Sequence, residues 1–212
     1  MIDAHVAPLS ASSSEPVWTS GWLSNARRCE SPNFGSRPEG VPIDLALIHS
    51  ISLPPGEYGG DAIERLFTNR LDWDEHPYFS QIRGLTVSAH FVVRRDGELV
   101  QFVSCDDRAW HAGASTWRGR NECNDFAVGI ELEGLEGSVF APQQYEALAW
   151  LMKKLALQYP LTAVAGHEHV APGRKFDPGS GFDWSHLMSL LEWPCKHFPD
   201  EIERAAATLP AR

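Results

Sequence analysis

Two histidines and an aspartate are the residues whose types and positions could bind a metal ion. His49 ends a nearly continuous apolar run, and His167 follows a second, shorter one. Segment 166–179 holds His167, a basic pair and Asp177 among glycines and prolines, so it can fold back and present His167 and Asp177 to one ion. Catalytic zinc takes three such ligands and leaves a fourth position for water. A solvated surface loop in which Asp177 caps a turn explains the same spacing equally well.

Two carboxylates and a lysine could carry out acid–base and electrostatic chemistry beside such a metal. Glu131 and Glu133 stand two positions apart in a predicted strand, so their side chains share one face. A carboxylate there can act as general base and then as general acid. Lys175 would place an ammonium where an oxyanion develops. The alternative is two solvent-facing carboxylates and an ordinary surface lysine, and spacing does not choose between Glu131 and Glu133.

The aromatic segment 108–113 is a candidate substrate wall. Trp110 could stack on a sugar ring, or it could be part of the core, and we interpret His111 as structural rather than catalytic. A glycosidase would need two carboxylates on opposite sides of a glycosidic bond. Glu131 and Glu133 lie on one strand face, which disfavours that reaction.

Alternating strand and helix patterns must position these groups. Apolar and β-prone runs predict strands at 43–50, 87–93, 98–103, 126–133 and 161–165. Amphipathic patterns predict helices at 61–68, 142–159 and 183–193. Asp96-Gly97 predicts a type I′ turn between the second and third strands, because that turn needs positive φ at both central residues. The interleaved elements predict an α/β fold with a mixed central sheet packed with helices.

Composition limits the possible classes of protein. The chain has 212 residues, a net charge of −10, 43% hydrophobic residues and four scattered cysteines. It is globular, and its acidity argues against nucleic-acid binding. No apolar run approaches the roughly 20 residues that span a bilayer, and no signal-peptide pattern is present. We therefore expect a cytoplasmic protein with reduced thiols that binds no membrane. We expect a disordered tail at 1–17, a single domain at 18–195 and a C-terminal tail at 196–212.

Six blocks of the chain resemble the zinc-dependent N-acetylmuramoyl-L-alanine amidases. This family includes cytoplasmic enzymes acting on 1,6-anhydro-muropeptides, phage lysozyme-type amidases and the peptidoglycan recognition proteins. The resemblance spans residues 21 to 190. The blocks are GWLSNARR (21–28), HSISLPPGEYGG (49–60), VSAHFVVRRDGELVQFV (87–103), RAWHAG (108–113), CNDFAVGIELEG (123–134) and GHEHVAPGRKFDPG (166–179).

The resemblance implies a mixed-sheet α/β fold, one Zn²⁺ ion and a defined set of site residues. Position 169 carries histidine where the family usually has an acid, which predicts an additional imidazole near the metal. The implied metal ligands, catalytic residues and cleft-lining residues are, in that order, His49, His167 and Asp177; Glu131 and Lys175; Trp110 and Arg174.

Three departures from the family pattern concern substrate binding. Ser50 stands where the family has asparagine, and Thr86 and Glu122 stand where it has arginine. These changes are expected to affect specificity for the substrate's carboxylates and sugar rather than the reaction itself. Arg118 or Arg120 is a candidate source of compensating charge.

The function expected from this resemblance is hydrolysis of the amide between the lactyl group of muramic acid and L-alanine. The substrate would be a 1,6-anhydro-muropeptide or another peptidoglycan fragment, and the enzyme would act as a monomer in peptidoglycan recycling. The alternatives are a non-catalytic muropeptide-binding module and an amidase that acts on intact peptidoglycan.

Overall fold

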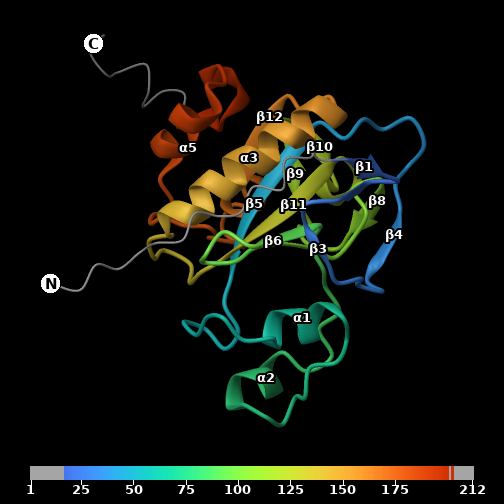
Figure 1. Ribbon diagram of the computed structural model, residues 1–212, viewed down its shortest axis with the longest axis vertical. Helices are drawn as coiled ribbons and strands as arrows, with labels where there is room; N and C mark the ends of the chain where they lie inside the picture. Colours follow the sequence, from blue (N-terminus) through green and yellow to red (C-terminus); the bar gives the residue numbers. More distant parts are fainter. Residues whose placement is uncertain (1–16, 201, 203–212) are drawn as a thin grey trace, which may run out of the picture.

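The computed structural model describes residues 17–200 and 202, and its centre is a six-stranded mixed sheet (Figure 1). Strands β12, β5, β11 and β6 run parallel, β7 is antiparallel to β6, and β3 is parallel to β7. In spatial order the strands are β12 (Ala163–Gly166), β5 (Leu45–Ile51), β11 (Ala127–Glu133), β6 (Phe91–Val93), β7 (Leu99–Gln101) and β3 (Arg27–Arg28). The predicted α/β fold with a mixed sheet is confirmed. The tail expected at 1–17 falls almost entirely outside the described residues.

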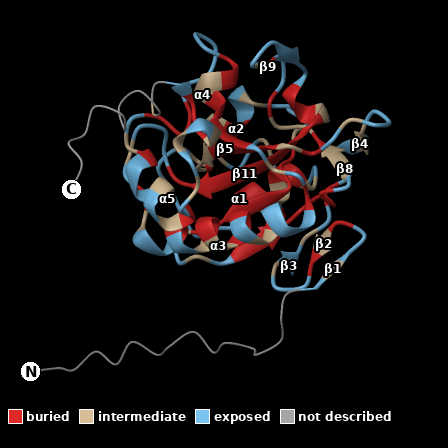
Figure 2. Cartoon of the chain, turned by 90° about the horizontal axis from the view of Figure 1, so that it is seen from above, coloured by how far each residue is buried: buried red, intermediate tan, exposed pale blue. Residues whose placement is uncertain are grey.

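The two central strands are buried over most of their length: every residue of β11 and the first five of β5 (Figure 2). Because both faces of these strands are covered, their sequences are nearly continuous apolar runs. Strand alternation directs Ala46 and Ile48 towards one core cluster and Leu45 and Leu47 towards another. His49 shares the second face with Leu45 and Leu47. The face opposite the main helices therefore carries the candidate ligand.

Two helices, α3 (Pro142–Gln158) and α5 (Trp184–Leu191), cover one face of the sheet. Pro142 occupies the first turn of α3, where its missing N–H costs nothing. The Gln144 amide donates to the carbonyl oxygens of Val93 and Glu133, at 3.1 and 3.0 Å. This buried side chain ties the start of α3 to the ends of β6 and β11.

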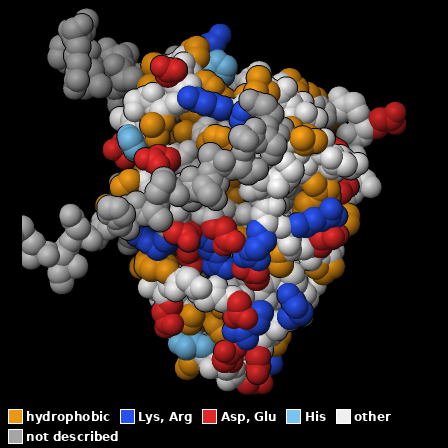
Figure 3. Space-filling view, in the orientation of Figure 1, with side chains coloured by type: hydrophobic (Ala, Val, Ile, Leu, Met, Phe, Trp, Pro, Cys, Tyr) orange, Lys and Arg blue, Asp and Glu red, His pale blue; other side chains and the backbone are white. Residues whose placement is uncertain are grey.

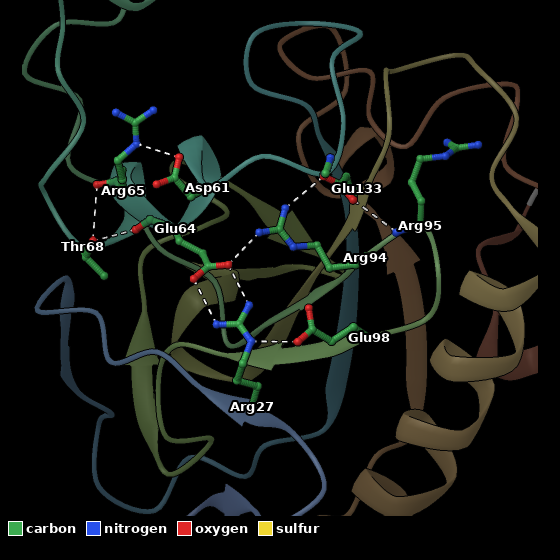
Figure 4. A network of polar contacts seen from close by, with 10 residues as sticks. Arg27, Asp61, Glu64, Arg65, Thr68, Arg94, Arg95, Glu98 and Glu133 are labelled. Carbon is green, nitrogen blue, oxygen red and sulfur yellow. Dashed lines mark hydrogen bonds and ion pairs between the residues drawn. The ribbon is translucent and has the colours of Figure 1, made fainter. Parts of the chain in front are cut away.

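A separate lobe contains α1 (Ala62–Phe67) and α2 (Pro77–Gln81) and extends below the sheet in Figure 1. Its apolar residues pack against β6 and β7 in a second core cluster. Charged groups also fasten it: Glu64 of α1 binds Arg27 of β3 and Arg94 beside β6, at 2.7 Å each (Figure 4). Arg94 in turn binds Glu133 of β11 at 2.9 Å. One ion-pair network thus joins the lobe to three segments of the sheet.

The connection between β6 and β7 differs from the predicted turn. Gly97 has φ of +91°, but Asp96 is absent from the described residues with positive φ, so the type I′ prediction is wrong. Gly97 N donates to the Arg94 carbonyl, and Arg94 N donates to the Glu98 carbonyl. These bonds close a three-residue loop in which only the last residue needs the left-handed conformation. The Asp96 carboxylate accepts a hydrogen bond from Glu98 N at 3.0 Å, which supports this geometry.

Short pairs of strands and short helices complete the described chain. The C-terminal part continues past residue 195, because Phe198 is fully buried in the main core and Arg118 donates to the Lys196 carbonyl at 3.0 Å. None of the helices in residues 17–200 and 202 has the length and apolar character needed to cross a bilayer. The short elements are β1 (Trp18–Thr19) with β2 (Trp22–Leu23), β4 (Phe34–Ser36) with β8 (Asp107–Ala109), β9 (Thr116–Trp117) with β10 (Arg120–Asn121), η1 (Cys123–Asp125), α4 (His167–Val170) and η2 (Cys195–His197).

Candidate active site

Three side chains converge where parallel strands β5 and β12 end. His49 lies near the end of β5, and His167 follows Gly166, which pairs with Ile48 in the sheet register. The loop after α4 returns so that Glu168 N donates to the Asp177 carbonyl at 2.9 Å. The Nδ1 atoms of His49 and His167 lie 2.9 Å apart, and each lies 3.2 Å from Oδ2 of Asp177. The three residues that the sequence suggested as ligands are therefore neighbours in space.

The orientation of these rings fits a divalent metal such as zinc. Nε2 of His167 lies 2.9 Å from the Ala112 carbonyl, which can only accept, so Nε2 carries the ring proton. In the neutral ring, Nδ1 then presents a lone pair to a carboxylate oxygen and a second imidazole. Such facing acceptors repel each other unless a cation lies between them. Tetrahedral Zn²⁺ sites, with bonds of about 2.0–2.1 Å, separate neighbouring ligand atoms by about 3.3 Å. The two histidine–aspartate separations of 3.2 Å are close to that spacing, and the 2.9 Å between the two Nδ1 atoms is shorter.

Burial shifts the pKa of His49, and contacts with the two rings shift that of Asp177. It lowers the pKa of His49 to about 4, so the ring is neutral near pH 7 and can act as a ligand. Burial by itself would raise the pKa of Asp177. Interactions with the rings of His167 and His49 outweigh this effect and bring the Asp177 pKa well below its ordinary value. A carboxylate and two neutral imidazoles are the protonation states that metal binding requires.

Glu131 stands beside this cluster, directly opposite His49 in the register of β11 and β5. It is 9% exposed, and its Oε2 atom has no hydrogen-bond partner among the described residues. Burial raises the pKa of Glu131 well above the ordinary glutamate value; the charge of Asp177 adds to the rise, and that of Lys175 opposes it. A carboxylate with a raised pKa is a stronger proton acceptor than an exposed glutamate, and its protonated form can return the proton.

Glu133 has the opposite environment. Its carboxylate accepts from Arg94 at 2.9 Å, from Gly59 N at 2.7 Å and from Arg95 N at 3.2 Å. The dashed contacts in Figure 4 show this carboxylate held between the lobe and the sheet. Of the two glutamates that spacing left equivalent, only Glu131 lines the cleft. Glu133 is therefore not placed to be the second carboxylate of a glycosidase.

The cleft above the cluster has a volume of about 450 Å³ and lies between the sheet edge and the lobe. Lys175, Trp110, Arg174 and Ser50 all line it, as the sequence analysis expected of residues near a substrate. The buried Ser50 hydroxyl has no hydrogen-bond partner within the described chain. Apolar side chains of the lobe and its flanking loops form the far wall, namely Leu66, Phe67, Tyr78, Ile82 and Leu85.

Arg118 and Arg120, which were expected to supply positive charge to the cleft, lie outside it. Arg118 donates to the Lys196 carbonyl and lies over the ring of Trp117. Arg120 forms an ion pair with Asp44 at 2.6 Å and lies over Phe126. Neither lines the cleft, so the suggested compensation is wrong. On the face shown in Figure 3, basic and acidic side chains are interspersed rather than gathered into a patch of one sign.

The additional imidazole expected near the metal has structural partners of its own. His169 occupies the third position of α4, where its Nδ1 atom accepts from Gly166 N at 2.9 Å. Its ring packs edge-on against Trp184 with a centroid separation of 5.3 Å. An acid at this position could accept the same hydrogen bond, so the histidine caps the helix in place of the acid.

Comparison with known proteins identifies the family. The family model described as N-acetylmuramoyl-L-alanine amidase matches residues 39–180, and the chain belongs to this family. The 1,6-anhydro-N-acetylmuramyl-L-alanine amidase AmpD of Citrobacter freundii is 49% identical over 179 residues, which cover 84% of this chain and 95% of that protein. The amidase assignment made from the sequence blocks is confirmed.

Solved structures give the same result. The crystal structure of a selenomethionine derivative of AmpD is 48% identical, covers 82% of this chain and 99% of its own, and superimposes with a TM-score of 0.79. A complex of Escherichia coli AmiD with anhydro-N-acetylmuramic acid-L-Ala-D-γ-Glu-L-Lys is 27% identical, with a TM-score of 0.53, and covers 82% of this chain and 65% of the other.

Proposed function

We propose that the protein is a zinc-dependent amidase that cleaves the bond between the lactyl group of muramic acid and L-alanine in 1,6-anhydro-muropeptides. The observation that carries this proposal is the position of the buried, unpartnered Glu131 directly opposite His49, within a cluster of three ligand side chains. AmpD relatives carry the name of this activity, and AmiD has been solved with an anhydro-muropeptide.

Nδ1 of His49, Nδ1 of His167 and Oδ2 of Asp177 would hold one Zn²⁺ ion. When bound, this ion supplies a Lewis acid that polarises the scissile carbonyl and makes a water molecule acidic near neutral pH. The chain provides the three ligands in a pocket where every ligand is at least nine-tenths buried.

Glu131 accepts the proton of the attacking water and delivers it to the departing alanine nitrogen. Its burial and its raised pKa suit the first step, because both make the carboxylate a stronger proton acceptor than an exposed glutamate. The protonated carboxyl group can then return the proton to the leaving nitrogen. Lys175 lines the same cleft and acts on Glu131 electrostatically. Its ammonium stabilises the oxyanion that forms on the amide carbonyl.

The walls of the cleft hold the sugar and the peptide. The indole of Trp110 offers a flat apolar surface for the muramic acid ring, and the apolar lobe surface faces it across the cleft. Arg174 donates from Nη2 to the carbonyls of Ala112 and Ala114, at 2.7 and 2.5 Å, and its charge attracts the peptide carboxylates. The unpartnered Ser50 hydroxyl is available to a substrate amide.

The cellular setting that we propose is the cytoplasm, where recycled muropeptides would be the substrate. All four cysteines are unpaired, in keeping with a reducing compartment. The ligands and cleft residues come from one chain, so a monomer would suffice. The net charge of −10 disfavours nucleic acid as a partner.

The test compares zinc-loaded and chelated protein on anhydro-muropeptide and on intact cell-wall sacculi, with products identified by mass. We expect zinc-dependent release of free peptide bearing an alanine amine from the soluble substrate. Binding without release would indicate a non-catalytic module, and products in which sugar and peptide stay joined would indicate a glycosidase. Release from sacculi alone would overturn the proposed substrate.

A further inference from the structure

We infer that residues His111 and Ala112, clamped by Asn124, form a positioning device that orients both candidate histidine ligands from behind. The inference rests on the proposed zinc site. It gives a role to His111 and Asn124, two residues of the blocks at 108–113 and 123–134 that the proposed reaction does not use. His111 and Asn124 are positioning residues, because they act through the ligands rather than on the substrate.

Two adjacent residues reach the two ligand rings on the side away from the cluster. Nδ1 of His111 lies 3.0 Å from Nε2 of His49, and the Ala112 carbonyl lies 2.9 Å from Nε2 of His167. With Nδ1 of each ligand ring turned towards Asp177, each Nε2 must carry the proton and donate it. The Ala112 carbonyl accepts one of these protons, and His111 Nδ1 lies where it would accept the other, so one dipeptide would hold the same tautomer in both rings. Acceptance at Nδ1 places the His111 ring proton on Nε2, which has no partner within the described residues.

Asn124 holds this dipeptide in place. Its Oδ1 atom accepts from His111 N at 3.2 Å and from Ala112 N at 2.8 Å. The side chain is 5% exposed and belongs to η1, which immediately precedes β11. Displacement of this one oxygen would remove a hydrogen bond from both residues of the dipeptide, although the Ala112 carbonyl also accepts from Arg174 at 2.7 Å. The position of the dipeptide is therefore tied to the strand that carries Glu131.

Gly129 of β11 makes room for the His111 ring. A Cβ atom at this position would lie 2.5–2.6 Å from three atoms of the ring, a separation that real contacts do not show. The ring also lies edge-on to His49 with centroids 5.0 Å apart. Because Gly129 lacks a side chain, the ring can lie flat against the sheet and reach His49. A glycine at position 129 of β11 is therefore required to accommodate the His111 ring.

Hydrogen-bond partners of the ligand rings influence how tightly a site binds its metal. A ligand ring whose remote N–H is hydrogen-bonded has a fixed orientation and a more basic ligating nitrogen, and loss of such a partner typically weakens metal binding by 10- to 100-fold. Here both rings depend on one segment, so the arrangement predicts that variants outside the ligand set weaken zinc binding.

The test uses isosteric pairs in the full-length protein. His111→Asn keeps an acceptor oxygen where Nδ1 lies, whereas His111→Leu has the same shape without an acceptor. Asn124→Asp and Asn124→Leu form a second pair, and His186→Leu on the exposed part of α5 is the control. Zinc affinity is measured by competition with a chromophoric chelator, and the visible spectrum of the Co²⁺-substituted protein reports ligand geometry. Circular dichroism and thermal unfolding of each metal-free variant report folding.

We expect His111→Leu and Asn124→Leu to bind zinc 10- to 100-fold more weakly and to change the Co²⁺ spectrum, whereas His111→Asn and His186→Leu stay within about threefold of wild type. Unchanged affinity in both leucine variants, or equal losses in His111→Asn and His111→Leu, would overturn the inference. If His111→Leu does not fold, the Asn124 pair decides. Wild-type protein that binds no zinc would overturn the proposed function itself, a result distinct from zinc binding that the variants leave unchanged.

Discussion

The cleft around Glu131 and the ion-pair network around Glu133 contrast sharply, although they lie two residues apart on one face of one strand. Glu133 is met by a guanidinium and two backbone N–H groups. Glu131 is also buried, at 9% exposed against 2% for Glu133, but one of its oxygens has no partner within the described residues. Folding gives the first carboxylate its hydrogen-bond partners and leaves the second with an unsatisfied buried oxygen, which costs free energy. A buried carboxyl group without a hydrogen-bond partner is expected where that group must act on a ligand. In this strand the lack of a partner, rather than the residue type, distinguishes Glu131 from Glu133.

The largest expected effect separates the two glutamates by activity. Glu131→Gln removes the proton acceptor and should reduce kcat by 10²- to 10⁴-fold, with zinc content unchanged. Glu133→Gln should leave kcat within a few-fold, because its side chain does not line the cleft. Steady-state kinetics on anhydro-muropeptide would measure both. Comparable losses of kcat in the two variants would break the comparison.

The next effect separates them by stability, in the opposite direction. Glu133→Gln leaves Arg94 without one of its two carboxylates, and loss of one partner of a buried ion pair costs about 3 kcal/mol of unfolding free energy. Glu131→Gln replaces a buried carboxyl group that lacks a partner with a neutral amide. The free energy of unfolding of the metal-free protein should therefore rise by about 1 kcal/mol. Urea denaturation of the metal-free variants would test this, and a fall in stability for Glu131→Gln would refute it.

A smaller effect is the loss of stability at low pH that comes from Glu64. Interactions with Arg27, opposed by burial and reinforced by Arg94, lower the pKa of Glu64 to about 2. A lowered pKa contributes stability above the ordinary value of 4.5, and this contribution is lost as pH falls towards 2. With solvent screening, the loss should be about 1 kcal/mol. Denaturation of wild type and Glu64→Gln should converge across this window, and a constant difference between them would contradict the assignment.

The smallest effect lies at the exposed end of the same network. Glu98 binds Arg27 at 2.8 Å, but its side chain is 43% exposed. Exposed pairs contribute about 0.5 kcal/mol or less, and salt screens them. Glu98→Gln should therefore barely change unfolding in 0.5 M salt. A loss as large as that of Glu133→Gln would mean that the network acts as one cooperative unit.

The sequence was most informative where a pattern was long and local. The apolar runs at β5 and β11 and the stripe of α3 predicted those elements within a few residues, because burial alone determines them. The turn at Asp96-Gly97 was predicted with the wrong type, because two flanking hydrogen bonds selected a three-residue loop.

The sequence patterns did not predict contacts between side chains of distant segments. Spacing treated Glu131 and Glu133 as equivalent, because Arg94 and Gly59 approach only Glu133 after the sheet has formed. Family resemblance singled out Glu131. The role of His111 was missed, since its partner His49 lies 62 residues away. An imidazole in a short glycine-containing block between strands was the available signal.

The candidate ligands also say something about the order of folding. His49 lies 118 residues from His167 and 128 from Asp177, so no early local structure can bring the three together. Contacts of such range form late in folding. An ion held here would therefore leave the folding rate nearly unchanged and would slow unfolding instead. During synthesis the three ligand side chains cannot come together until residue 177 has been added to the chain and β12 has joined the sheet.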